Sequence, residues 1–177
     1  MSHRKIVITG GPSTGKTSVI DSLTELGYVC FPEISRQVTL EARKLGIEQL
    51  FLEDPILFSE KLLEGRIKQY IEAEKHSNHL VFLDRGIPDV IAYMDYIGDS
   101  YPAHFSKACQ QNSYDTVFLL PPWQAIYTSD SERYESFEQA IAIHDHLENT
   151  YRRFGYNLVE VPTGTVEDRV SFIIKHL

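Results

Sequence analysis

Five short runs of apolar, β-branched or aromatic residues recur along the chain, and longer stretches with helical spacing separate them. The runs are Lys5–Thr9, Tyr28–Phe31, Leu80–Leu83, Thr116–Leu120 and Asn157–Val161. Continuous apolar runs of this length are typical of strands that are buried on both faces. Their alternation with helices predicts an α/β fold in which helices cover both faces of a parallel sheet.

The stretches between these runs carry apolar residues at intervals of three and four, as amphipathic helices do. One stripe comprises Val19, Ile20, Leu23 and Leu26, and a second comprises Ile56, Leu57, Leu63, Ile67 and Ile71. Proline begins three helical patterns, at Pro55, Pro88 and Pro102, and glycine closes three, at Gly27, Gly98 and Gly155. We expect the irregular stretch 121–136 to form a mobile loop that acts as a lid.

Length and composition narrow the class of protein. The chain has 177 residues, 42% of them apolar and 24% charged, which predicts one soluble globular domain over residues 1–177. A formal net charge of −8 argues against a nucleic-acid binder, since phosphate backbones are held by clustered Lys and Arg. Cys30 and Cys109 are interpreted as reduced thiols. With no transmembrane run and no secretory signal at the N-terminus, the expected location is the cytoplasm.

The segment "GGPSTGKT" follows the first predicted strand and precedes a helical stripe. It meets the pattern GxxxxGK[ST], in which small residues let backbone N–H groups converge on phosphate oxygens at the start of a helix. In this pattern Lys16 reaches the β- and γ-phosphates and Thr17 ligates Mg²⁺. The predicted nucleotide-binding residues are Gly10, Gly11, Pro12, Ser13, Thr14, Gly15, Lys16, Thr17 and Ser18.

Asp84 ends the third apolar run, in "LVFLDRG". Ligands of open α/β sheets bind at the carboxyl ends of the strands, so Asp84 is the predicted second metal residue, holding the Mg²⁺ shell. The alternative for Asp84 is a turn or helix-capping acid.

These residues resemble the P-loop NTPases, and in particular their nucleoside and nucleotide kinase branch, in which an Asp-Arg pair follows the same strand. The segments "GYVCFPEISRQV", "FLDRGIPDVIAYM", "FLLPPW", "ERYESFEQA" and "GYNLVEVP" are similar to a family of kinase-like AAA domains. That family includes the ribosylnicotinamide kinase domain of bacterial NAD regulators and the TRPL translocation defect proteins of animals.

The resemblance implies a three-layer α/β/α sandwich with a parallel sheet in the order 2-3-1-4-5. No Asn-Lys-x-Asp tetrad is found, which argues against a guanine-specific switch GTPase. The extra helical domain and paired arginines of AAA+ ring motors are not found either.

Glu33, at the end of the second predicted strand, resembles the acid that many nucleoside kinases use to accept an alcohol proton. A helix-terminal acid is the equal alternative. Arg36 and Arg85 are predicted to bind substrate, or else to pair with Glu33 or Asp89. Asp89 caps a helix or lines the acceptor site.

Arg133 lies where kinase-like relatives carry a lid arginine that closes over the transferring phosphate. Its neighbours Asp130, Glu132 and Glu135 are acidic and weaken that assignment. The run Tyr151, Arg152, Arg153 is interpreted as a basic helix end.

Two functions fit these residues. The first is a kinase that uses ATP and Mg²⁺ to phosphorylate a small nucleoside-like or ribosyl acceptor. The second is a regulatory ATPase or GTPase whose nucleotide state switches a protein or lipid partner. An open cavity lined by Glu33 and Arg85 would favour the kinase, and a filled one the switch.

Overall fold

A five-stranded sheet forms the centre of the computed structural model, which describes residues 4–127 and 135–177. The strands lie in the order β2-β3-β1-β4-β5, and all four pairings are parallel. Their bounds are β1 Arg4–Gly10, β2 Val29–Phe31, β3 Leu80–Asp84, β4 Thr116–Leu120 and β5 Leu158–Glu160. The five predicted strands and the predicted strand order are confirmed.

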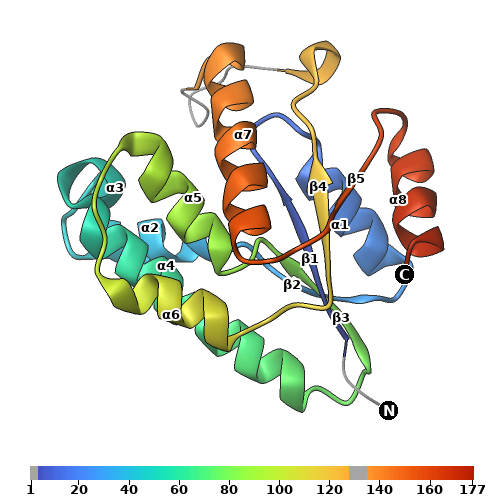
Figure 1. The fold of residues 1–177 in the computed structure, drawn as a ribbon, viewed down its shortest axis with the longest axis horizontal. Coiled ribbons are helices and arrows are strands. Elements are labelled where there is room, and N and C mark those ends of the chain that lie inside the picture. The colour runs from blue at the N-terminus through green and yellow to red at the C-terminus, as the bar shows by residue number, and fades with distance from the viewer. Residues whose placement is uncertain (1–3, 128–134) are drawn as a thin grey trace.

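Helices lie on both faces of this sheet (Figure 1). They are α1 Lys16–Glu25, α2 Ile34–Lys44, α3 Leu50–Glu53, α4 Pro55–Lys75, α5 Pro88–Ile97, α6 Ala103–Gln111, α7 Phe137–Arg153 and α8 Val166–Lys175. A 3₁₀ turn, η1, covers Gln124–Ile126. Within the described ranges, no helix is long and apolar enough to cross a membrane.

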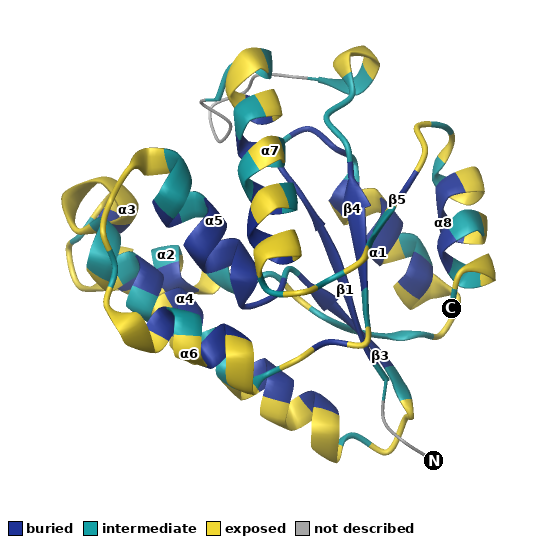
Figure 2. Cartoon of the chain, viewed as in Figure 1, coloured by how far each residue is buried: buried dark blue, intermediate teal, exposed yellow. Residues whose placement is uncertain are grey.

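The alternation of side chains along β1 divides the core into two layers. Ile6 and Ile8 pack with α1 and α8, whereas Val7 packs with residues of α4, α5, α6 and α7. β1 lies between β3 and β4, and helices cover both of its faces, so Ile6, Val7 and Ile8 are all buried, which explains its continuous apolar run. Figure 2 shows this band of buried strands between helices whose outer surfaces are exposed.

The predicted helix boundaries are largely confirmed. Pro55 and Pro88 begin α4 and α5, and Pro102 is the residue before α6. Gly98 ends α5 in the left-handed region with φ 77°. Helix α1 ends at Glu25, so Leu26 lies beyond it and is exposed rather than on the buried stripe.

The predicted apolar stripe of α4 is partly wrong. Leu57 and Ile71 are exposed, while Arg66 and Gln69 are buried. The Gln69 side-chain amide donates to the Pro32 carbonyl at 2.7 Å, and Arg66 binds the Gly86 carbonyl at 3.0 Å. Polar side chains that find partners can occupy a buried face, and a hydrophobicity pattern does not detect them.

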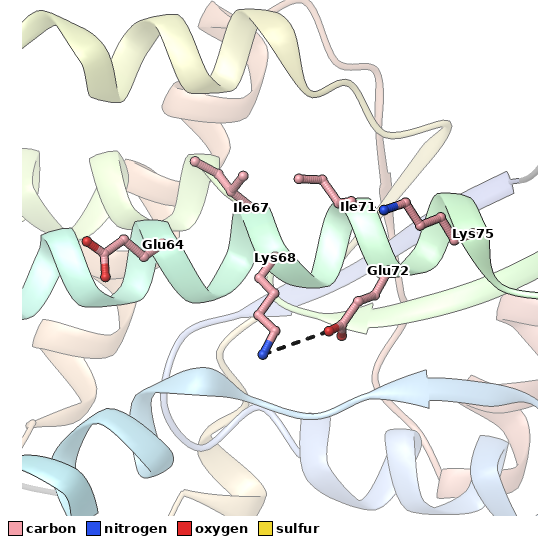
Figure 3. A pocket seen from close by; sticks show the side chains of 6 residues that line it. All are labelled: Glu64, Ile67, Lys68, Ile71, Glu72 and Lys75. Carbon is pink, nitrogen blue, oxygen red and sulfur yellow. Dashed lines mark ion pairs between the residues drawn. The ribbon is translucent and has the colours of Figure 1, made fainter.

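Of the other predicted apolar residues, Leu63 is buried in the core and Ile67 is partly buried against it. Figure 3 shows Ile67 and Ile71 among charged side chains of α4, of which Lys68 pairs with Glu72 at 3.9 Å. The helix therefore has an exposed face rich in charged residues and a buried face that is mixed and hydrogen-bonded.

Candidate functional site

The segment Gly11–Gly15 connects the carboxyl end of β1 to the start of α1. A Cβ atom on Gly10 would lie 2.8 Å from the Leu120 carbonyl oxygen, so only glycine fits beside β4 at this point. Gly15 precedes α1 with φ 75° in the left-handed region and has no side chain that could cap the helix. The first-turn N–H groups and the positive end of the α1 dipole are therefore directed toward the loop.

Lys16 is buried at the start of α1, and its ammonium group contacts two carboxylates. Its Nζ atom forms an ion pair with Asp84 and lies 4.0 Å from Oε2 of Glu33. Burial lowers the pKa of Lys16, and the nearby charge of Arg85 lowers it further, whereas Asp84 and Glu33 act in the opposite direction. The phosphate loop, β2 and β3 thus meet at one group of charges.

Glu33 lies between β2 and α2 and contacts three cations. It is the N-cap of α2, where it accepts a hydrogen bond from the Ser35 N–H at 3.2 Å. Its carboxylate also pairs with Arg85 and, at 3.2 Å, with Arg66. Burial by itself would raise the pKa of Glu33, but Arg85, Arg66 and Lys16 outweigh burial and hold it at about 2. Glu33 is both the helix acid and the carboxylate at the strand end.

Asp89 is fully buried in the first turn of α5 and accepts four hydrogen bonds. The donors are Thr9 Oγ1 at 2.6 Å, Tyr151 OH at 2.5 Å, the Gly86 N–H at 2.9 Å and Arg85 Nη1 at 3.1 Å. Burial and the Asp89 carboxylate both raise the pKa of Tyr151, which keeps its hydroxyl proton available for donation. This network fixes Arg85 between Glu33 and Asp89.

Arg85 has a left-handed backbone with φ 74°, which is uncommon for a residue other than glycine. Such conformations persist where surrounding contacts determine them, and they gather at functional sites. Here the Arg85 N–H donates to the Ile8 carbonyl at 3.0 Å and the guanidinium contacts two acids. This backbone conformation, directly after β3, lets the Arg85 side chain reach the acids at the carboxyl ends of the strands.

A cavity of about 620 Å³ opens beside these charges. Its lining includes four charged residues that are linked by ion pairs, Glu33, Arg66, Arg85 and Asp89. The other lining residues are partly apolar or aromatic, such as Phe51, Phe58, Leu62, Tyr93 and Met94, and partly polar, such as Asp99 and Glu135. An apolar pocket with a few convergent polar groups is the usual form of a small-molecule site.

The structure brings most of the sequence-predicted site residues to one edge of the sheet. Arg36, in contrast, is exposed on α2 and is not among the residues that line the cavity. Thr17 is exposed at the start of α1. Arg133 and its neighbours Asp130 and Glu132 lie outside the described residues, so the predicted lid arginine stays a prediction.

Three residues of this site were missed by the sequence analysis. Arg66 lies 33 residues from its partner Glu33, and Tyr151 lies 62 residues from Asp89. Thr9 was assigned only to the strand. The sequence signal that could have identified Arg66 is its place beside the apolar stripe of a predicted helix. Tyr151 gave no such signal, because it precedes Arg152 and Arg153 in a helix end that was interpreted as basic.

Asp84 and the Thr17 hydroxyl supply oxygen atoms, the donor type that Mg²⁺ prefers. Among the described residues there is no cluster of three or more His, Cys, Asp or Glu side chains that could hold a metal. Because Mg²⁺ usually binds through one or two protein groups together with phosphates and water, Asp84 and Thr17 are the candidate ligands.

The strand order and the phosphate loop are those of the P-loop fold that solved nucleoside and nucleotide kinases share. A family model described as an AAA domain matches residues 5–169, and the chain belongs to this family. No curated protein matches the sequence.

Three solved structures illustrate the likeness. A deoxyadenosine kinase from M. mycoides, with dCMP and dCDP bound, is 17% identical with a TM-score of 0.70, and 97% of each chain is covered. NadR protein in complex with NR is 18% identical with a TM-score of 0.72, covering 98% of this chain and 49% of NadR. The chain thus spans about half the length of NadR.

The third structure is a shikimate kinase from Acinetobacter baumannii in complex with shikimate. It is 18% identical with a TM-score of 0.62, covering 98% of this chain and 92% of the kinase. At these identities the comparisons show the fold that the chain shares with P-loop kinases.

Proposed function

We propose that the chain is an ATP- and Mg²⁺-dependent phosphotransferase that acts on a hydroxyl group of a small, nucleoside-like acceptor. The observation that carries this proposal is the open cavity lined by Glu33 and Arg85. Oε2 of Glu33 lies 4.0 Å from Nζ of Lys16, so the cavity and the phosphate loop share a boundary. A nucleotide-dependent switch would not need such a cavity, and a kinase would.

The charges of the cavity lining favour an acceptor without negative charge. Glu33, Asp89, Asp99 and Glu135 supply four carboxylates, against the guanidiniums of Arg66 and Arg85. Both guanidiniums already pair with Glu33 or Asp89. The aromatic side chains of this lining, together with its charged groups, fit a molecule that has one planar apolar part and one hydroxyl-bearing part, as a nucleoside has.

The residues divide the chemistry among them. Lys16 and the N–H groups at the start of α1 would bind and stabilise the phosphates as charge develops on them. The acceptor oxygen forms a bond to the γ-phosphorus while the bond from that phosphorus to the β–γ bridging oxygen breaks, and ADP leaves. The acceptor's hydroxyl proton passes to Glu33.

Because its pKa is about 2, Glu33 is a carboxylate at neutral pH. A base this weak orients the hydroxyl by accepting its hydrogen bond and takes the proton late, when the oxygen has begun to bond to phosphorus. Mg²⁺, held by Thr17 and Asp84, would neutralise negative charge on the β- and γ-phosphate oxygens.

A screen with ATP labelled at the γ-phosphate tests the proposal. Neutral and cationic nucleosides, nucleoside monophosphates and simple sugar alcohols are supplied as acceptors, and labelled products are separated and counted. We expect transfer to a neutral or cationic nucleoside-like compound, and a loss of 100-fold or more in kcat for Glu33→Gln. Glu41→Gln, on the exposed part of α2, should keep wild-type activity.

If ATP binds but no acceptor in the panel receives phosphate, the kinase proposal fails and the regulatory NTPase becomes the better interpretation. If Glu33→Gln transfers phosphate at the wild-type rate, the proposed acceptor site is kept, but Glu33 has no part in the mechanism.

A further inference from the structure

Arg169, on α8, lies against the phosphate loop, on the face of the sheet opposite the acceptor cavity. Its side chain is 2% exposed. Nη2 donates a hydrogen bond to the Thr14 carbonyl oxygen at 2.6 Å, although the two residues are 155 positions apart. A Cβ atom on Gly15 would lie 2.6 Å from Nη1 of Arg169. The guanidinium therefore packs directly on the backbone of the loop.

The charge of this guanidinium is not offset by an acid. Across residues 4–127 and 135–177, no carboxylate forms an ion pair with Arg169, and its Nε atom is buried without a hydrogen-bond partner. Its acidic neighbour on α8, Asp168, instead binds Thr165. Burial lowers the pKa of Arg169, and no neighbouring group acts in the opposite direction.

Arg66 and Arg85 show the usual arrangement for comparison. Arg66 is buried and Arg85 is largely buried, and both pair with Glu33, so their charges are balanced within the protein. A buried guanidinium without an acid is costly unless a counter-charge arrives from elsewhere. Arg169 contacts the backbone of the phosphate loop, where a bound polyphosphate would bring such a charge.

We propose that Arg169 is a positioning residue for the nucleotide. Its hydrogen bond to Thr14 holds the Thr14–Gly15 segment in the shape that binds phosphate, and the negative charge of the bound polyphosphate balances its guanidinium. This inference rests on nucleotide binding by the loop, as the proposed function does, but not on the identity of the acceptor. A residue that acted only as a structural hydrogen-bond donor would support the loop without sensing the charge of the ligand.

The salt dependence of binding separates these two roles. Binding of the ATP analogue AMP-PNP with Mg²⁺ is measured by calorimetry between 50 and 400 mM KCl for the wild type, Arg169→Gln and Arg169→Lys. Lys175→Gln is the matched control, because it removes one positive charge from an exposed position of the same helix. Displacement of AMP-PNP by adenosine, which carries no phosphate, is measured in parallel, because displacement reports binding at the nucleotide site and not in the acceptor cavity.

We expect Arg169→Gln to weaken AMP-PNP binding about tenfold or more at low salt and to bind with a shallower salt dependence than the wild type. Adenosine binding should be unchanged. Arg169→Lys keeps the charge but not the planar fork, so its affinity should fall while its salt dependence stays that of the wild type. Lys175→Gln should match the wild type in both quantities.

Wild-type affinity and salt dependence in Arg169→Gln would overturn the inference and leave the proposed function intact. An equal loss for adenosine and AMP-PNP, at unchanged salt dependence, would overturn it in favour of a structural role. If the wild type binds no AMP-PNP, the inference and the proposed function fail together. Should Arg169→Gln not fold, Arg169→Lys decides, and wild-type affinity in that variant would overturn the inference.

Discussion

Glu33 shows how neighbouring cations set the behaviour of a single carboxylate. Burial alone would favour the protonated acid, as it does for an isolated carboxyl in an apolar site. Arg85, Arg66 and Lys16 reverse that effect and bring the pKa to about 2. Arg169 is in the opposite situation, with burial and no counter-ion among the described residues. The charge of Glu33 is balanced in the free protein, whereas the charge of Arg169 is balanced only by the proposed ligand.

The depressed pKa of Glu33 predicts a pH dependence of stability. The unfolded chain titrates this carboxyl near 4.5 and the folded protein near 2. Its contribution is therefore fully present above about pH 4.5 and is lost as the pH falls toward 2. Between pH 6 and pH 3 the wild type should lose on the order of 2 kcal/mol more free energy of unfolding than Glu33→Gln does.

Urea denaturation at a series of pH values measures this difference. The other carboxylates titrate in both proteins, so the comparison isolates the group at position 33. Parallel pH curves for the two proteins would contradict the assignment of a strongly depressed pKa.

At the scale of elements, α4 connects the two halves of the site. Its inner face carries Arg66, which reaches Glu33 between β2 and α2 and the Gly86 carbonyl between β3 and α5. Gln69, one turn later, reaches the Pro32 carbonyl. These contacts make α4 the support that holds the connections after β2 and β3 side by side. Its exposed face carries ion pairs such as Lys68–Glu72.

This asymmetry predicts different outcomes for two substitutions on the same helix. Arg66→Leu removes a buried partner of Glu33 and leaves the Gly86 carbonyl without its donor, so it should lower the free energy of unfolding by about 3 kcal/mol. Lys68→Leu breaks an exposed pair and should change it by less than about 0.5 kcal/mol. Chemical denaturation of both variants gives the comparison, and equal effects would contradict the supporting role of α4.

At the scale of the whole molecule, the parallel sheet gathers charges from distant parts of the sequence. The carboxyl ends of β1, β2 and β3 lie at one edge, so the phosphate loop, Glu33 and Asp84 become neighbours. In the free protein Lys16 pairs with Asp84 and lies near Glu33. A bound triphosphate would replace these acids as the partner of Lys16.

The proposed nucleotide site predicts stabilisation of the folded protein by its ligand. At a concentration of ATP with Mg²⁺ 100 times its Kd, the free energy of unfolding should rise by about 2.7 kcal/mol, which raises Tm. Lys16→Met should abolish this rise because the phosphates lose their main cation. Lys107→Met, at an exposed position of α6, should keep it. Thermal unfolding with and without nucleotide provides the test, and a full rise in Lys16→Met would argue against the site.

The sequence by itself determined the five strands, most helix boundaries and the phosphate loop, because each depends on nearby residues. A buried parallel strand needs a continuous apolar run, and a turn such as Gly10–Gly15 needs glycine where the backbone is close to β4 or left-handed. The resemblance to known kinases added the strand order, which periodicity does not contain. Glu33 and Asp84 were found because they lie at or just after the carboxyl ends of strands.

Only the tertiary structure decided which charges balance one another. Arg66, Tyr151 and Arg169 take their roles from partners 33, 62 and 155 positions away, and no local pattern records such contacts. The buried face of α4 was mispredicted for the same reason, since Arg66 and Gln69 are buried only because distant carbonyl and carboxylate groups receive their hydrogen bonds. Local sequence sets where a chain turns and extends, whereas burial of polar groups depends on the partners that folding brings to them.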